Sequence, residues 1–162
     1  MKNISILSLL LVLLLIACTE EKQEVTAKEE SKKVLLEEPE VELATYMANM
    51  QRYLEKMYWS AKANNEPLHQ FYLHELEEQM ESVQEAGITE DGVNVSYNML
   101  HYGIKSLEVY EERVKEEGLT SYPGHFKNLI NGCNACHMVS KKPFVVIKTP
   151  ELNIYSSQSF EP

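Results

Sequence analysis

Apolar residues between positions 40 and 140 recur at the three- and four-residue spacing of an α-helix, and this spacing constrains the fold most strongly. The first such stretch carries them at Leu43, Met47, Met50, Leu54, Met57 and Ala61. The pattern returns over about residues 68–87, 93–117 and 121–137, with short breaks rich in Asn, Gly and Pro between the stretches. Short connections make neighbouring helices run in opposite directions. The sequence therefore predicts an all-α domain over residues 40–140, folded as an antiparallel four-helix bundle.

The two ends of the chain lack this pattern. Residues 18–39 are rich in Glu and Lys and contain no aromatic residue, so we interpret them as a flexible acidic tether. In residues 141–162 an apolar, largely β-branched run, Phe144 to Ile147, is bounded by prolines, and Pro143 cannot continue a helix. We expect this last segment to form an extended tail packed on the bundle.

Residues 1–17 begin with a lysine and continue as an apolar run that is short for a membrane-spanning helix, as in a secretory signal peptide. The run ends in the letters LIAC at positions 15–18, which resemble a bacterial lipobox. The resemblance implies that Cys18 carries lipid and anchors the protein to a bacterial membrane, on the periplasmic side or at the cell surface. The residue after the cysteine, Thr19, is not the aspartate that signals retention in the inner membrane, so the outer membrane is favoured by analogy. An uncleaved anchor and an ordinary signal peptide are the alternatives.

Residues 131–140 read NGCNACHMVS and contain the other two of the chain's 3 cysteines. Cys-x-x-Cys-His is the signature of covalent c-type haem attachment, in which two thiols bind the porphyrin and the imidazole reaches the iron. On a helix, Cys133, Cys136 and His137 would project toward one face. The motif therefore predicts one haem c, with thioether bonds to Cys133 and Cys136 and with His137 as the proximal iron ligand.

Three other interpretations of the motif compete with haem. A zinc site would need a fourth ligand, and the sequence offers neither a second cysteine pair nor a His-x-x-x-His. A thioredoxin-like redox pair would need a neighbouring strand, whereas the surroundings are predicted to be helical. A structural disulfide between Cys133 and Cys136 would leave His137 without a role. The agreement of motif, predicted export and cysteine count favours haem.

With its motif late in the last of four predicted helices, the chain resembles cytochrome c-prime and the related four-helix-bundle class II cytochromes c. The phrases MANMQRYLEKM and PELNIYSSQSF are also similar to a group of bacterial haem-binding proteins. The resemblance covers about residues 40–140. Class II chains usually end soon after the motif, whereas this chain continues to Pro162.

The ligand opposite His137 on the iron decides between two functions. In an up-and-down bundle the end of the last helix lies beside the start of the first, where Met47 and Met50 stand on the inward stripe. A thioether ligand suits electron transfer, and the resemblance to methionine-ligated relatives favours Met47, with Met50 second. An open sixth position would instead make a gas-binding protein of the cytochrome c-prime kind. A histidine as the sixth ligand is the remaining alternative, and His101 is the least implausible of the histidines.

The net charge of −10 excludes the function classes that depend on binding phosphate backbones, so no nucleic-acid partner is expected. No motif of a hydrolase or a phosphate-binding loop is present in the sequence, and we expect no enzymatic activity. The expected partners are an unidentified redox protein and, through the lipid, a membrane. The residues leave the oligomeric state open, and a homodimer is the state that related bundles often adopt.

Overall fold

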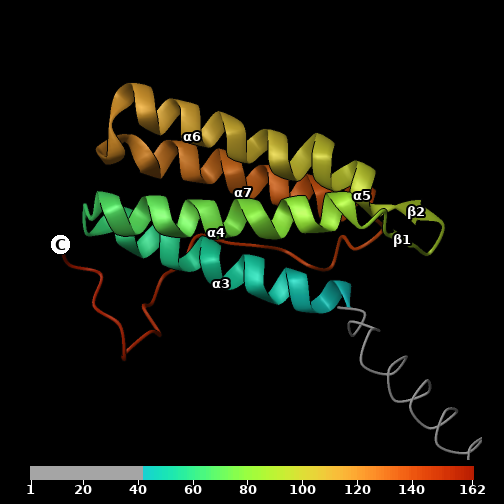
Figure 1. Ribbon diagram of the computed structural model, residues 1–162, viewed down its shortest axis with the longest axis horizontal. Helices are drawn as coiled ribbons and strands as arrows, with labels where there is room; N and C mark the ends of the chain where they lie inside the picture. The colour runs from blue at the N-terminus through green and yellow to red at the C-terminus, as the bar shows by residue number, and fades with distance from the viewer. Residues whose placement is uncertain (1–41) are drawn as a thin grey trace, which may run out of the picture. The chain divides into compact units, whose positions relative to one another are not determined.

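The computed structural model describes residues 42–162, so the predicted signal peptide, the lipidated Cys18 and the tether of residues 18–39 lie outside it. The described chain is mostly helical, which confirms the coarse prediction of the fold. The long helices lie alongside one another (Figure 1) and are α3 (Leu43–Lys62), α4 (Glu66–Glu85), α6 (Lys105–Glu117) and α7 (Tyr122–Val139). No helix in residues 42–162 combines the length and the apolar character that crossing a bilayer requires.

Asn65 fixes the connection between α3 and α4. Its Oδ1 accepts a hydrogen bond of 3.2 Å from the N–H of Leu68, which makes it the N-cap of α4, and Pro67 occupies the first turn. Its Nδ2 donates to the carbonyl oxygens of Phe160 and Glu161, each at 3.1 Å. The helix begins two residues before the range that the helical spacing predicts, and the Asn65 side chain also ties residues 160 and 161 to the helices.

The connection after α4 is a β-hairpin, where the sequence predicts only a turn. β1 (Thr89–Glu90) pairs antiparallel with β2 (Val93–Asn94), Thr89 opposite Asn94 and Glu90 opposite Val93. Asp91 and Gly92 between the strands have positive φ angles of 51° and 73°. A type I′ turn needs positive φ at both central residues, and Asp-Gly is one of the pairs that supply it. Two-residue strands are too short to show alternation in a sequence.

The third predicted helix, over residues 93–117, is helical from Val95 onward, but it is not an α-helix throughout. After β2 the chain forms a short helix α5 (Val95–Asn98), then a π-helix η1 (Met99–Ile104), and only then α6. Each turn of a π-helix contains more residues than an α-turn, so the α-helical spacing fails across η1. Tyr97 shows the effect, because the spacing predicts it inside and the structure leaves it 58% exposed.

Elsewhere the predicted inward stripes form the core. The buried members are Met50, Leu54, Met57, Ala61, Leu73, Leu76, Met80, Val83, Ile104, Leu107, Val114, Phe126, Leu129 and Ile130. The sequence places these side chains at helical intervals, so each helix buries one face against its neighbours.

The helix α7 approaches η1 and α6 closely at Gly132. A Cβ atom added there would overlap the side chain of Ser106 and lie 3.1 Å from the carbonyl oxygen of Tyr102. The Ser106 hydroxyl donates to that same carbonyl at 2.6 Å, so it is already held in place. Because glycine has no side chain, position 132 allows a contact between helix backbones directly before Cys133.

The helix α7 ends in a Schellman motif that turns the chain back along the helices. The N–H of Lys142 donates to the carbonyl of His137 at 2.8 Å, and the N–H of Lys141 donates to that of Met138 at 3.2 Å. Lys141 adopts the left-handed conformation that this motif requires, with φ of 61°. Residues 143–162 contain no helix or strand and run beside the helices (Figure 1).

His69 is a buried polar group in the core, far from α7's end. Its Nδ1 lies 3.2 Å from the carbonyl oxygen of Met57, which can only accept, so Nδ1 carries the proton. Its Nε2 faces the hydroxyl of Tyr110 at 3.4 Å. Burial lowers the pKa of His69, and the Met57 carbonyl and the charge of Glu66 oppose this only in part. The folded protein therefore holds this imidazole neutral.

Replacing Gly132 with alanine should destabilise the fold by about 1–3 kcal/mol, because the added methyl group overlaps Ser106. Gly124, also in α7, is the matched control, since no atom lies within 4 Å of a Cβ added there. Gly124→Ala should stabilise by about 0.5–1 kcal/mol through helix propensity. Urea unfolding measures both variants, and effects of the same sign would contradict the close approach at Gly132.

The free energy of unfolding should fall as the pH drops below 6.5, the ordinary pKa of histidine. The folded-state pKa of His69 is lowered, so below that pH the unfolded chain binds a proton that the folded chain does not. The loss approaches about 1.4 kcal/mol per pH unit while this difference holds. Urea unfolding between about pH 6.5 and 5 measures it.

Two variants separate this effect from other titrations. His69→Gln should flatten the fall between these pH values, because the group that binds the extra proton is gone. His74→Gln is the control, since the His74 side chain is 64% exposed and pairs only with Glu78. A fall that persists unchanged in His69→Gln would show that another group causes it.

Candidate functional site

A cavity of about 440 Å³ lies between the first half of α3 and the second half of α7. Leu76 and Met80 of α4, and Met99 and Gly103 of η1, line it as well. The chain that follows α7 supplies Ile147 and other residues to the wall. The lining is mostly apolar, and the volume falls within the range of about 300–1,000 Å³ found in small-molecule and cofactor sites.

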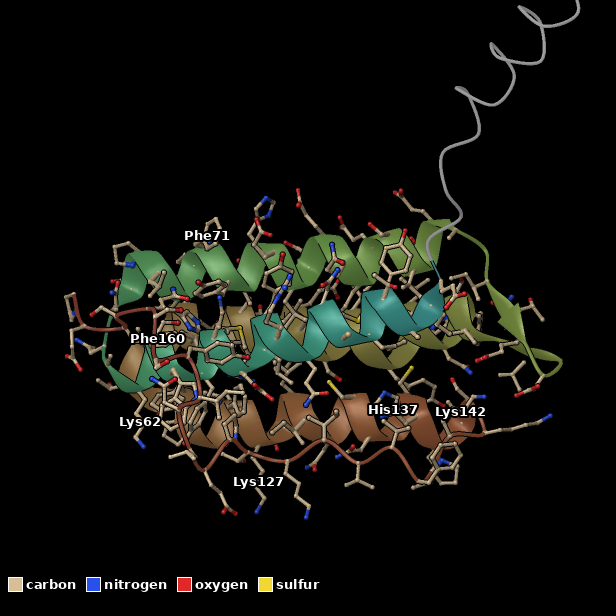
Figure 2. The ribbon with its side chains drawn as sticks, turned by 90° about the horizontal axis from the view of Figure 1, so that it is seen from below. Lys62, Phe71, Lys127, His137, Lys142 and Phe160 are labelled. Atoms are coloured by element: carbon tan, nitrogen blue, oxygen red, sulfur yellow. The ribbon has the colours of Figure 1, made fainter. Side chains whose placement is uncertain are left out.

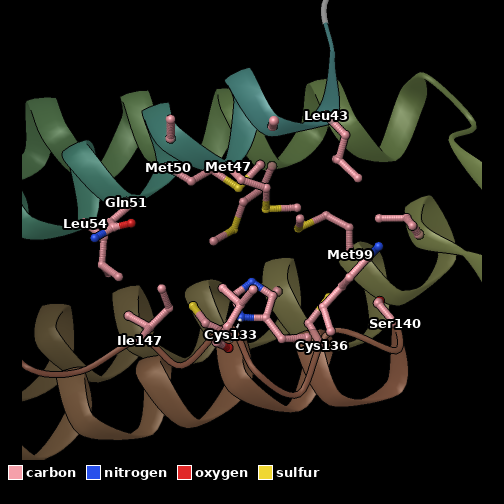
Figure 3. Close-up of a pocket in the computed structure, with 18 of the residues that line it drawn as sticks. Leu43, Met47, Met50, Gln51, Leu54, Met99, Cys133, Cys136, Ser140 and Ile147 are labelled. Atoms are coloured by element: carbon pink, nitrogen blue, oxygen red, sulfur yellow. Dashed lines mark hydrogen bonds between the residues drawn. The ribbon is translucent and has the colours of Figure 1, made fainter. Parts of the chain in front are cut away.

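The two thiols of the motif and the histidine line this cavity together. Cys133, Cys136 and His137 occupy positions i, i+3 and i+4 of α7, so they share a face. Figure 3 shows Cys133 and Cys136 on one side of the cavity and Met47 and Met50 of α3 on the other. The four residues that the sequence analysis assigns to a haem and its iron, and the runner-up Met50, are thus brought to one cavity.

The thiols are held in their neutral form. Burial raises the pKa of Cys133 to about 12, and the neighbouring Cys136 adds to the rise. Burial also raises the pKa of Cys136, against a lowering contribution from a hydrogen bond with Ser140. Both cysteines are free rather than joined in a disulfide. Redox-active Cys-x-x-Cys pairs depend on a lowered thiol pKa, so this environment does not favour the thioredoxin-like alternative.

The imidazole of His137 is oriented by the chain that follows α7. Its Nδ1 lies 2.9 Å from the carbonyl oxygen of Val145. Because a carbonyl only accepts, Nδ1 carries a proton, and in the neutral imidazole it is then Nε2 that has the free lone pair. Histidines that bind metals usually donate their other ring N–H in this way, which fixes the ring and raises its basicity. His137 is therefore prepared to offer Nε2 to a metal.

Methionines make up much of the wall opposite His137. Met47 and Met50 of α3 are joined by Met80 and Met99, which the sequence analysis does not assign to the site. A Cβ added at Gly103 would lie 2.6 Å from Sδ of Met99 and 3.8 Å from Sδ of Met80, so both sulfurs lie close to this glycine. Met99 and Gly103 reach the cavity from the π-helix, an element that often marks functional sites. No signal in the sequence identifies it.

The charged side chains of the cavity wall are paired. Lys142 Nζ lies 3.0 Å from Oδ2 of Asp91 and 3.5 Å from Oε2 of Glu90, in the hairpin. These contacts raise the pKa of Lys142, the hydrogen bond with Asp91 most of all. The pairing fixes the hairpin against the end of α7, and the cavity is left with little unpaired charge.

The other histidines do not line the cavity. His69 is buried in the core as described above, and His74 pairs with Glu78 on the surface at 3.3 Å. His125 lies 2.9 Å from Glu117, near the start of α7. His101 is exposed and packs on the ring of Tyr97, with centroids 4.1 Å apart. A histidine opposite His137 is therefore not supported.

The site combines neutral thiols, an oriented imidazole and thioethers around an apolar space. Within residues 42–162, no three His, Cys, Asp or Glu side chains are grouped closely enough to hold a metal ion, so the zinc alternative gains no support. An apolar cavity with thiols on one wall suits a flat, apolar cofactor that is attached covalently and whose metal takes N or S ligands. A comparison of the chain with known protein families, curated proteins and solved structures found no match.

Proposed function

We propose that the protein is a monohaem c-type cytochrome that transfers electrons. One haem would be attached through Cys133 and Cys136, with His137 as the proximal iron ligand and Met47 as the distal one. The observation that carries the proposal is the common cavity: the Cys-x-x-Cys-His residues of α7 and Met47 of α3, some ninety residues apart in sequence, line the same apolar space of about 440 Å³.

Each residue has a definite task in this proposal. The cysteines would hold the macrocycle at two points on one face of α7, and their burial, which raises their pKa, favours the neutral thiol form. The Val145 carbonyl holds the His137 ring so that Nε2 faces away from that bond. When bound, the haem supplies an iron that changes between its ferric and ferrous states. The mostly apolar wall would place few polar groups around the haem, which limits the rearrangement that each electron transfer requires.

The methionine wall favours an electron carrier over a gas-binding protein. A thioether ligand fills the sixth position and raises the reduction potential, whereas a gas-binding haem needs that position open. Met47 and Met50 both line the cavity across from the cysteines. Met47 is the ligand of this proposal because it stands nearer the start of α3, beside the end of α7.

The wider proposal concerns the fold and the location. We propose that α3, α4, α6 and α7 form an antiparallel four-helix bundle and that residues 141–162 pack along it as a tail; the short connections and the contacts of residues 145–161 support this. The protein would be anchored by lipid on Cys18 to a bacterial membrane, outside the cytoplasm, and would exchange electrons with a partner protein. It would perform no bond-making reaction, and it could act as a monomer or a homodimer.

The first test is covalent attachment. Protein made in a host with haem-maturation machinery should carry the added mass of one haem after denaturation, because thioether bonds survive unfolding. The double variant Cys133→Ala, Cys136→Ala should lose this mass. Met138→Ala is the matched control, since this neighbour is 68% exposed and does not line the cavity. Denatured protein without the added mass, from a host that matures other c-type cytochromes, would contradict the proposal.

The second test concerns the sixth ligand. Oxidised protein should show a low-spin spectrum with a sulfur-to-iron charge-transfer band, and carbon monoxide should leave the reduced spectrum unchanged. Met47→Ala should lose the band and bind carbon monoxide, whereas Met50→Ala should keep the band. A high-spin parent that binds the gas would support the gas-binding alternative. A band that survives in Met47→Ala and disappears in Met50→Ala would assign the ligand to Met50.

A further inference from the structure

We infer that Asn134, the residue between the two thiols of the motif, is a positioning residue for His137 and acts through the backbone of residues 145–147. The inference rests on the proposed function, in which His137 binds iron. In the general Cys-x-x-Cys-His pattern the intervening positions can be any residue, so nothing in the motif itself gives Asn134 a role.

The Asn134 side chain makes both of its hydrogen bonds with one residue of the returning chain. Its Oδ1 accepts from the N–H of Ile147 at 2.8 Å, and its Nδ2 donates to the carbonyl of Ile147 at 3.0 Å. Two residues earlier, the carbonyl of Val145 accepts the hydrogen bond from Nδ1 of His137 at 2.9 Å. The segment from Val145 to Ile147 is thus fixed to α7 at both ends.

Through these contacts, Asn134 and His137 both bind the same backbone segment, residues 145–147. Asn134 and His137 are three residues apart on α7, so they are neighbours on the helix surface. Val145 and Ile147 are two residues apart, and alternate residues of an extended chain face the same side. A shift of Ile147 relative to Asn134 would therefore carry the Val145 carbonyl away from the imidazole.

The amide group of asparagine suits this task better than any close substitute. It offers one donor and one acceptor at the spacing of a backbone N–H and C=O. An aspartate at position 134 would accept from the Ile147 N–H but would meet the Ile147 carbonyl without a donor. Alanine would make neither bond, and Val145 would keep only its own N–H bond to the carbonyl of Lys142, at 3.0 Å, and its contact with His137.

A second attachment of the returning chain, outside residues 145–147, provides a matched control. The hydroxyl of Tyr155 donates to Oε2 of Glu55 in α3 at 2.7 Å, eight residues beyond Ile147. This bond also ties the returning chain to a helix, but it has no contact with α7. Tyr155→Phe therefore removes one attachment of the chain without touching the arrangement at His137.

The test uses haem-loaded protein and the variants Asn134→Ala, Asn134→Asp and Tyr155→Phe, with three measurements. Hydrogen exchange of the Ile147 amide should be faster in Asn134→Ala by about two- to tenfold, the effect of losing one hydrogen bond. The nitrogen-15 NMR signal of Nδ1–H of His137 should exchange with water faster in this variant. The reduction potential should rise, because the Val145 carbonyl makes the imidazole more electron-donating and so stabilises ferric iron.

Asn134→Asp should lie between the parent and Asn134→Ala in the two exchange measurements, and these carry the test if the alanine variant does not fold; its reduction potential is left out of the comparison because the added negative charge lowers the potential by itself. Tyr155→Phe should match the parent at Ile147 and His137. A faster Ile147 exchange with unchanged His137 signal and potential would overturn the inference, and so would an unchanged Ile147 exchange. Protein purified without haem would contradict the proposed function, and the Ile147 and His137 signals of the same variants would still decide this inference.

Discussion

The close backbone contact at Gly132 is the constraint on which the rest of the site depends. Because position 132 has no side chain, α7 can lie directly against the turn that contains Tyr102 and Ser106. The next residue in the chain is Cys133, so the depth of the first thiol in the cavity follows from this contact. The cavity lies between α3 and α7, and methionines of α3, α4 and η1 line it together with Val145 and Ile147 of the chain after α7.

Much of this arrangement could be predicted from the sequence, because it depends on local patterns. Helical spacing identifies the inward faces of α3, α4 and α7, and the short breaks rich in Asn, Gly and Pro give their limits within a few residues. The three motif residues share a face through the i, i+3, i+4 geometry alone. Their meeting with Met47 required one further step, that the end of the last helix lies beside the start of the first.

The features that the sequence does not predict depend on contacts between distant segments or on an unusual backbone conformation. The hairpin of residues 89–94 has strands too short for a periodic signal, and the π-helix breaks the spacing that a sequence reading assumes. Met99 lines the cavity from that π-helix, so the α-helical spacing does not predict its place either. The bonds of Asn134 and His137 to residues 145–147 form only when the returning chain passes α7, and no local pattern encodes its path (Figure 2).

The π-helix also sets the rotation of everything that precedes it. One residue in an α-helix corresponds to about 100° of rotation about the axis. If the same six residues, Met99–Ile104, adopted ordinary α-helical pitch with none removed, α5 with the hairpin would be rotated about the helix axis by about that angle, because a π-turn takes up roughly one extra residue. Asp91 and Glu90 would then leave Lys142. The extra residue in the turn of the π-helix thus sets the rotation that keeps the acidic hairpin aligned with the end of α7.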